Sequence, residues 1–107
     1  MVEWDGLASP RLVGLGPKNL IDNNMYYVYI LKSKKINKLY KGSTADLKQR
    51  LIDHNRGKVK STKAFSPWVL IYYETFISKK DALVEELFLK SGKGKERIKF
   101  LLVDTLK

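Results

Sequence analysis

The sequence contains no cysteine and only one histidine, His54. Without cysteine there is no disulfide bond, no thiolate nucleophile and no cysteine-ligated zinc, and this composition is typical of a protein in the reducing cytoplasm. A single histidine also excludes a metal centre built from several histidines. The kind of metal site that remains is one in which carboxylates hold a hard divalent cation.

The sequence has no apolar run long enough to cross a membrane and no strongly basic amphipathic helix, so we expect no membrane partner. Acidic residues are few: the sequence has 11 Asp and Glu but 21 Lys and Arg, which gives a net charge of +10. A small basic domain with six Tyr, four Phe and two Trp favours a polyanionic partner. We therefore expect a nucleic acid as partner, with DNA favoured over RNA. The protein itself is expected to be a monomer or a weak dimer.

Residues 1–24 differ in composition from the rest of the chain. They hold three of the seven glycines, two of the three prolines, two basic and three acidic residues, which leaves +11 for residues 25–107. We predict that 1–24 is an N-terminal extension, poorly ordered or non-native, and that 25–107 is one folded domain.

The first half of this domain predicts a hairpin followed by a helix. YYVYIL (26–31) and LYKG (39–42), the latter ended by its glycine, are short β-branched and aromatic runs. Thr44 or Asp46 caps a helix that runs to about residue 56 and stops at Gly57.

The second half predicts one strand and two helices. WVLIYYETF (68–76) is the longest strand signal, a helix starts at Ser78 and ends before Gly92, and a last helix covers 95–106. The order β-β-α-β-α-α predicts an α/β fold, a small sheet with helices packed on it.

The first predicted helix carries two polar side chains inside its apolar arc. At 100° per residue, Arg50 and His54 fall within about 60° of Leu47, in the same sector as Leu51. One explanation is structural, an arginine that extends to solvent and a core-edge histidine near a helix C-terminus. The other is functional, with both side chains turned toward a site beside the sheet.

The second predicted helix repeats this pattern around Leu83 and Leu87, which we expect to face the core. Glu86 and Lys90 share their sector, whereas Glu85 falls on the opposite side and should face solvent. Glu86 is then either half of an ordinary i,i+4 ion pair with Lys90 or an inward carboxylate that holds one divalent cation.

Tyr29 and Tyr40 lie on the two strands of the predicted hairpin. A strand tyrosine usually packs with its hydroxyl in water, but beside an arginine and a metal-bound water it can relay a proton. Basic residues lie at the end of the second strand and in the loops, where they either stay solvated or contact phosphate: Lys41, Arg56, Lys58, Lys60, Lys63, Lys93 and Lys95.

Three segments, in this order and spacing, resemble the GIY-YIG nuclease superfamily: YVYIL (27–31), LYKGSTADLKQRLIDHNRG (39–57) and DALVEELFLKSGKGKERIKFL (81–101). The chain is most similar to the small stand-alone bacterial GIY-YIG domain proteins, which are related to the catalytic module of excinuclease C. The resemblance spans about 25–107 and implies a three-stranded antiparallel sheet flanked by helices. It also implies phosphodiester hydrolysis with one divalent cation, Mg²⁺ or Mn²⁺.

The family motifs imply roles for five residues of this chain. Tyr29 matches the tyrosine that ends the first motif and Tyr40 the one that opens the second, and both would position and deprotonate the attacking water. Arg50 would neutralise charge on the transition state, and His54 would tune a tyrosine or the phosphate. Glu86 would hold the metal.

The chain departs from the family pattern at three points. The first motif lacks its glycine and isoleucine, lysine stands at position 41 in place of isoleucine, and no asparagine follows Asn55, although several family members carry one after the glutamate. We predict a metal-dependent endonuclease that hydrolyses DNA phosphodiester bonds, in repair or in the processing of damaged, branched or single-stranded DNA. The alternative is a module that binds DNA or RNA without cutting it.

Overall fold

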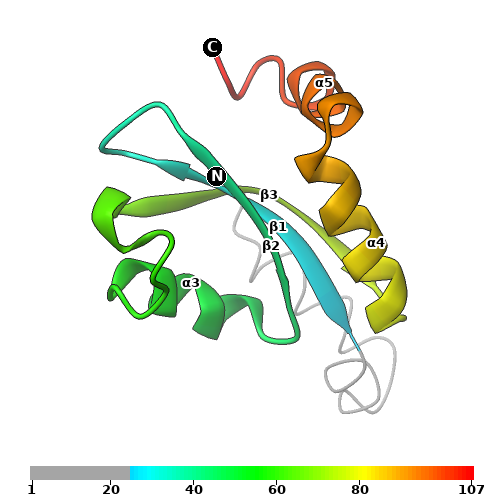
Figure 1. Cartoon of the computed structure of the whole chain (residues 1–107), viewed down its shortest axis with the longest axis horizontal. Helices are drawn as coiled ribbons and strands as arrows, with labels where there is room; N and C mark the ends of the chain where they lie inside the picture. The colour runs from blue at the N-terminus through cyan, green and yellow to red at the C-terminus, as the bar shows by residue number, and fades with distance from the viewer. Residues whose placement is uncertain (1–24) are drawn as a thin grey trace, which may run out of the picture.

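The computed structural model describes residues 25–107, and the prediction for 1–24 lies outside these described residues. The elements are β1 Tyr26–Ser33, β2 Leu39–Thr44, α3 Leu47–Asn55, a 3₁₀ turn at Lys63–Phe65, β3 Trp68–Phe76, α4 Lys79–Lys90 and α5 Gly92–Leu101. The predicted order β-β-α-β-α-α is therefore confirmed (Figure 1). Within this part of the chain, no helix has the length and apolar character to span a membrane.

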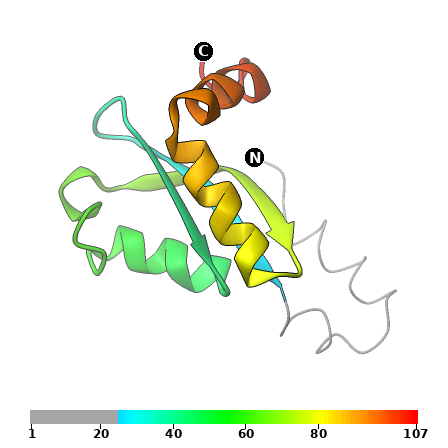
Figure 2. The ribbon, with the colours of Figure 1, turned by 45° about the vertical axis from the view of Figure 1, so that its right-hand side comes forward.

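The three strands form one antiparallel sheet, as the family resemblance implied, and their order is β2-β1-β3. The central strand β1 is buried on both faces, which explains its unbroken run of large apolar residues. Tyr29 and Leu31 belong to the core on the α3 side, whereas Val28 and Ile30 belong to the core on the other side. Figure 2 shows α4 crossing this second face.

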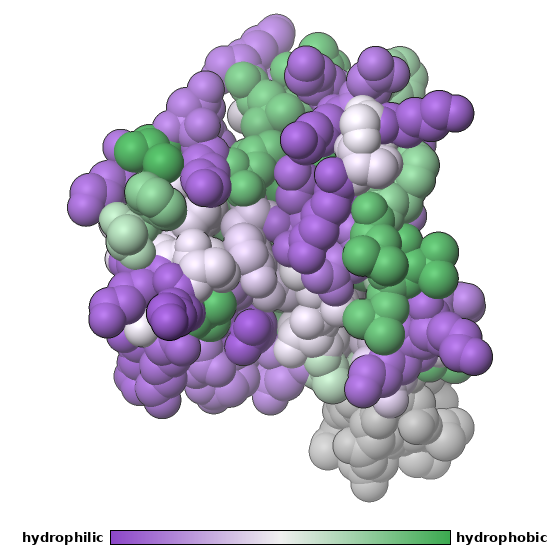
Figure 3. Space-filling model, viewed as in Figure 1, coloured by the Kyte–Doolittle hydropathy of each residue, from purple (hydrophilic) through white to green (hydrophobic). Residues whose placement is uncertain are grey.

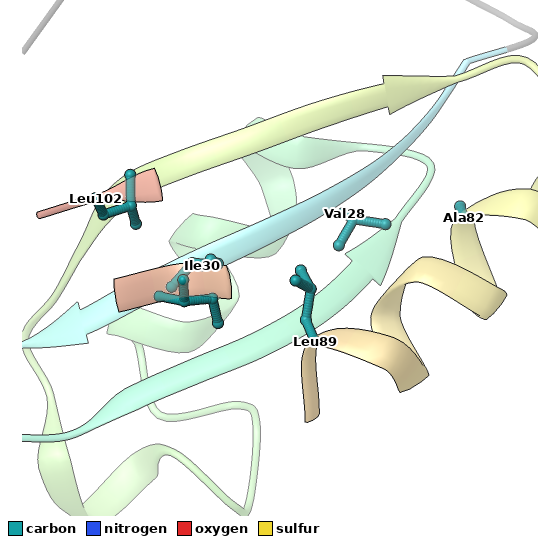
Figure 4. Packing of buried hydrophobic residues seen from close by; sticks show 6 residues of the cluster. Val28, Ile30, Ala82, Leu89 and Leu102 are labelled. Carbon is teal, nitrogen blue, oxygen red and sulfur yellow. The ribbon is translucent and has the colours of Figure 1, made fainter. Parts of the chain in front are cut away.

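Small and branched side chains fill the core between the sheet and the two C-terminal helices. Val28 and Ile30 pack there with Ala82 and Leu89 of α4 and with Leu102, which follows α5 (Figure 4). Burying one such large aliphatic side chain stabilises the fold by about 1.5–3 kcal/mol. This core holds α4 against β1 and β2 and so fixes which of its side chains reach the edge of the sheet.

The ends of α3 follow the sequence signals closely. Asp46 is the N-cap, and its Oδ1 accepts a hydrogen bond from the Gln49 backbone N–H at 3.1 Å. The Thr44 hydroxyl oxygen instead accepts from the Asp46 backbone N–H at 3.1 Å. The helix ends at Asn55, and Gly57 has a φ of 77°, the left-handed conformation that favours glycine after a helix.

The last helix begins at Gly92 and ends at Leu101, so the predicted range 95–106 is wrong at both ends. Ser91 caps it by accepting a hydrogen bond from the Gly94 backbone N–H at 3.1 Å, and the glycine-rich segment is therefore helical. A Cβ on Gly94 would collide with the Phe88 carbonyl oxygen at the end of α4. The tight junction between α4 and α5 therefore requires glycine there despite its low helix propensity.

The prediction that Leu83 and Leu87 face the core is wrong. They are 43% and 68% exposed, whereas Ala82 and Leu89 are each 1% exposed. The small side chain of Ala82 lets the α4 backbone approach the sheet closely, and this rotates the two leucines outward. The green area over α4 in Figure 3 corresponds to this exposed apolar face.

Candidate active site

Four predicted site residues gather on the α3 side of the sheet. Tyr29 lies on β1 and Tyr40 on β2, while Arg50 and His54 lie one turn apart on α3. The Tyr40 ring centroid lies 4.9 Å from that of His54 and 6.3 Å from that of Tyr29. The Arg50 guanidinium lies beside both tyrosine hydroxyls, and its interactions with them, chiefly with Tyr29, raise the pKa of Arg50. The polar side chains within the apolar arc of α3 therefore face the two tyrosines.

A chain of hydrogen bonds connects Tyr29 to the segment after α3. Tyr29 Oη lies 2.8 Å from His54 Nε2, and His54 Nδ1 lies 2.8 Å from Thr62 Oγ1. The Thr62 hydroxyl donates its single hydrogen to the Val59 carbonyl oxygen at 3.3 Å, so its oxygen accepts one from Nδ1. We therefore assign the imidazole hydrogen to Nδ1, which leaves Nε2 to accept the Tyr29 hydroxyl hydrogen. Tyr29, His54 and Thr62 are all at most 1% exposed.

Burial sets the charge states of this chain. Burial, aided by the positive charge of Arg50, lowers the pKa of His54 to about 4. His54 is therefore neutral near pH 7 and able to accept a proton. Burial also raises the pKa of Tyr29 to about 12, against the opposing hydrogen bond from Arg50. Tyr29 consequently keeps its proton near neutral pH unless a neighbouring base takes it.

Gly42 lies directly opposite Tyr29 in the β1–β2 pairing. A Cβ on Gly42 would lie 2.6 Å from Tyr29 Oη and 3.0 Å from the Cε2 of Tyr40. The prediction that Gly42 ends the strand is wrong, because β2 continues to Thr44. Glycine is required at this position for a close approach, which leaves room for the Tyr29 hydroxyl beside His54.

Glu86 approaches the same edge strand from the opposite face of the sheet. Its Oε1 accepts a hydrogen bond from Ser43 Oγ at 2.6 Å, and its Oε2 accepts one from Lys90 Nζ at 2.7 Å. Ser43 follows Gly42 on β2, and the alternation of strand side chains places it on the α4 side. The negative charge of Glu86 also acts on Tyr29, whose pKa it raises. The two groups of residues therefore contact neighbouring positions of β2, Gly42 and Ser43, from opposite faces. Figure 1 shows β2 between α3 and α4.

The donor set at Glu86 fits a cation that keeps most of its water. Over residues 25–107, no three His, Cys, Asp or Glu side chains form a cluster. Mg²⁺ suits such a site, because it commonly binds through one or two carboxylates together with water and substrate phosphate. The Glu86 side chain is 17% exposed and so accessible to a cation, provided that Lys90 moves away from Oε2. Ser43 Oγ is a second oxygen at the same place.

Ser43 and Thr62 belong to this arrangement but are not among the residues predicted from the sequence. Strand alternation beyond Gly42 was a usable signal for Ser43, since it places this side chain on the face opposite to Tyr40. Thr62 gives no signal, because it lies in an irregular basic segment eight residues after His54. Only the folded path of the chain brings its hydroxyl to the imidazole.

The structure separates the basic residues predicted to contact nucleic acid. Lys41 and Lys95 line one pocket between β2 and α5, while Lys93 is exposed on α5 and does not line it. The others are exposed between α3 and β3: Arg56, Lys58, Lys60 and Lys63. The predicted basic set therefore lies on both sides of the β2 edge.

Glu85 is half-buried against Glu74 of β3, so the prediction that it faces solvent is wrong. Burial, followed by the hydrogen bond and the negative charge of Glu74, raises the pKa of Glu85 to about 7. Tyr72 donates a hydrogen bond to Glu74 Oε2 at 2.8 Å, whereas Glu74 Oε1 is buried without a partner among the described residues. Protonation of Glu85, which its raised pKa favours, would give this oxygen a hydrogen-bond donor.

Replacing Glu85 with glutamine is expected to change how stability depends on pH. Since the folded-state pKa of Glu85 is raised from 4.5 to about 7, its contribution to the free energy of unfolding is lost as the pH rises through that range. His54 acts oppositely, because its lowered pKa makes stability fall as the pH drops from 6.5 toward 4. Without Glu85, only the effect of His54 remains, and stability should rise with pH between about 4 and 6.5.

Urea denaturation at pH 5.0 and 7.5 measures this effect. From pH 5.0 to pH 7.5, the free energy of unfolding of Glu85→Gln should increase relative to that of the unmodified chain. The expected increase is only on the order of 1 kcal/mol, because solvent screens a half-buried carboxyl. A difference in stability between the two proteins that is the same at both pH values would contradict the raised pKa of Glu85.

Comparison with known proteins identifies the family. Residues 25–99 match the family model described as the GIY-YIG catalytic domain, and the chain therefore belongs to this family, which is one of nucleases. Among its relatives are small UPF0213 proteins. That of Staphylococcus haemolyticus is 40% identical over 77 residues, covering 71% of this chain and 93% of the relative. That of Bacillus pumilus is 37% identical over 78 residues, covering 72% and 79%.

One solved structure is similar in sequence as well. It is the solution NMR structure of the UPF0213 protein BH0048 from Bacillus halodurans, which is 35% identical to this chain. The match covers 72% of this chain and 84% of the other, with a TM-score of 0.46.

Proposed function

We propose that the protein is a metal-dependent endonuclease that hydrolyses phosphodiester bonds in DNA. The observation that carries this proposal is the buried chain from Tyr29 through His54 to Thr62. Its Tyr29 end lies beside Arg50 and opposite Gly42 of the edge strand β2, and Glu86 contacts that strand from the other face. Such a chain can accept a proton next to a fixed cationic group. Both are needed to attack a phosphodiester with water.

In this mechanism Tyr29 and His54 act together as the base. The attacking water gives a proton to Tyr29 Oη while Tyr29 passes its own proton to His54 Nε2, so that neither tyrosinate nor hydroxide accumulates. Thr62 holds the tautomer in which Nε2 is free. Because Tyr29 is only 1% exposed, the water has to approach from the side of Arg50 and the half-buried Tyr40. We assign the positioning of that water to Tyr40.

Arg50 would stabilise the negative charge that grows on the phosphoryl oxygens as the new P–O bond forms and the bond to the leaving oxygen breaks. Glu86 and Ser43 would hold the divalent cation, which when bound supplies further charge stabilisation at the phosphate and the leaving oxygen. Lys90 keeps the Glu86 carboxylate neutralised and in place before the cation binds.

The proposal extends to DNA as the substrate, to repair or processing of damaged, branched or single-stranded forms, and to a cytoplasmic location. To test it, labelled single-stranded, duplex, nicked and branched DNA are incubated with the protein and Mg²⁺, Mn²⁺ or EDTA. We expect cleavage with either cation, none with EDTA, and a loss of roughly 10²–10⁴-fold in Tyr29→Phe. Binding of every substrate with no cleavage under any condition would favour the non-catalytic module instead.

A further inference from the structure

A pocket of about 550 Å³ lies between β2 and α5, on the α4 side of the sheet. Half of its eight lining residues are lysines and none is acidic. These lysines come from both elements and from the turn before β2: Lys38, Lys41, Lys95 and Lys99. Figure 3 shows hydrophilic side chains beside a hydrophobic area on the surface between β2 and the C-terminal helices, and the apolar lining residues are Leu39, Ile98 and Leu106.

The positive charge in this pocket has no carboxylate partner among the residues that line it. Lys41 is half-buried, and burial together with the nearby charges of Lys95 and Lys90 lowers its pKa. The Glu86 carboxylate on the adjacent helix already accepts hydrogen bonds from Ser43 and Lys90. Like charges held together at a partly desolvated place destabilise the fold unless an anion joins them. An anionic ligand bound in this pocket would offset the repulsion between the lysines.

The position of the pocket indicates which anion it takes. Lys41 stands on β2 between Tyr40 and Gly42, so the pocket begins one residue from the strand positions that face the proposed active site. Separate ammonium groups spread along a strand and a helix suit phosphates that repeat along a backbone, because each lysine acts as a point charge. A phosphate here would lie within a few nucleotides of one held at Arg50 and Glu86.

We propose that this lysine pocket binds the phosphodiester backbone of the substrate strand, a few nucleotides from the bond that is cut. The inference rests on the proposed function in naming the strand as substrate. It adds Lys99 to the nucleic-acid contacts and directs the strand along β2 and α5. Lys38 is not counted among these contacts, because its ammonium lies over the Phe65 ring, 4.9 Å from the ring centroid. Lys41, which replaces the isoleucine of the family motif, would then contact a backbone phosphate.

Binding without metal tests this inference separately from catalysis. The affinity for a fluorescein-labelled 20-nucleotide single strand is measured by anisotropy in EDTA at several salt concentrations. The double variant Lys41→Gln/Lys95→Gln should bind at least tenfold more weakly at low salt. Its slope of log Kd against log salt should fall by roughly 1.4, because two phosphate contacts are lost. The control Lys34→Gln/Lys80→Gln removes two exposed lysines outside the pocket and should change the affinity less than twofold.

An equal salt slope in the pocket variant and the unmodified chain overturns the inference, whether or not the protein cleaves DNA. A lowered slope with no cleavage by any variant upholds the pocket and overturns the proposed function alone. Inorganic pyrophosphate serves as the competing small ligand in an NMR titration of the backbone amides of Lys41 and Lys95. If it shifts these amides at concentrations as low as the oligonucleotide requires, the pocket serves a small phosphate ligand and the strand assignment is overturned.

Discussion

Glu86→Gln is expected to lower the rate of Mg²⁺-dependent DNA cleavage by roughly 10³-fold, because it removes the carboxylate charge that would hold the cation. The fold should be unaffected, since glutamine retains the length of the side chain and an oxygen for Ser43. Single-turnover cleavage at pH 7.5 measures the rate. Electron paramagnetic resonance of free Mn²⁺ provides a second readout, because the variant should remove less Mn²⁺ from solution in the presence of DNA.

The adjacent glutamate provides the matched control. Glu85→Gln makes the same chemical change on the next residue of α4, but Glu85 faces Glu74 and takes no part in the proposed site. Its cleavage rate and Mn²⁺ binding should stay within about twofold of the unmodified chain. Equal losses in the two variants would show that charge removal from α4, not the position of Glu86, determines activity.

Gly94→Ala is expected to have the largest effect on stability, a loss of about 3 kcal/mol or more in the free energy of unfolding. The added Cβ would meet the Phe88 carbonyl oxygen and the Leu89 Cα, which are backbone atoms that no side-chain rotation can move. The junction of α4 and α5 would have to open, and Leu89 and Ile98 would lose core contacts. Urea denaturation followed by circular dichroism measures the loss.

Gly92→Ala is the control on the same helix. Within residues 25–107, no atom beyond its chain neighbours and its own helix backbone lies within 4 Å of the position that its Cβ would occupy. Alanine should therefore be neutral or stabilise the helix by up to about 1 kcal/mol. If Gly94→Ala proves as stable as Gly92→Ala, the close α4–α5 junction described above does not exist in solution.

Local signals in the sequence were sufficient for most of the fold. Asp46, Gly57 and Ser78 mark helix ends through their own side-chain or backbone chemistry, and these marks are confirmed. The inward face of α3 could also be predicted, because Arg50 and His54 share the arc of Leu47, which is buried. A 3.6-residue period identifies such an arc whenever the apolar side is unambiguous.

The orientation of α4 could not be obtained in the same way. Leu83 and Leu87 define one apolar arc and Ala82 and Leu89 define another, and side-chain hydrophobicity favours the first. Close contact between helix and sheet selects the second, because Ala82 is small. The inward placement of Glu86 holds in either orientation, since it lies beside both arcs. The placement of Glu85 depends on which of the two arcs faces the sheet, so the sequence pattern does not predict its burial.

Single-turnover cleavage by Arg50→Ala, Glu86→Gln and the double variant tests the central claim, that residues from the two faces of the sheet form one active site at the β2 edge. Groups that act as one unit lose activity non-additively. We therefore predict that each single variant falls to nearly the same residual rate and that the double variant falls little further. Cleavage that persists in both single variants, or losses that simply multiply in the double variant, would contradict the claim.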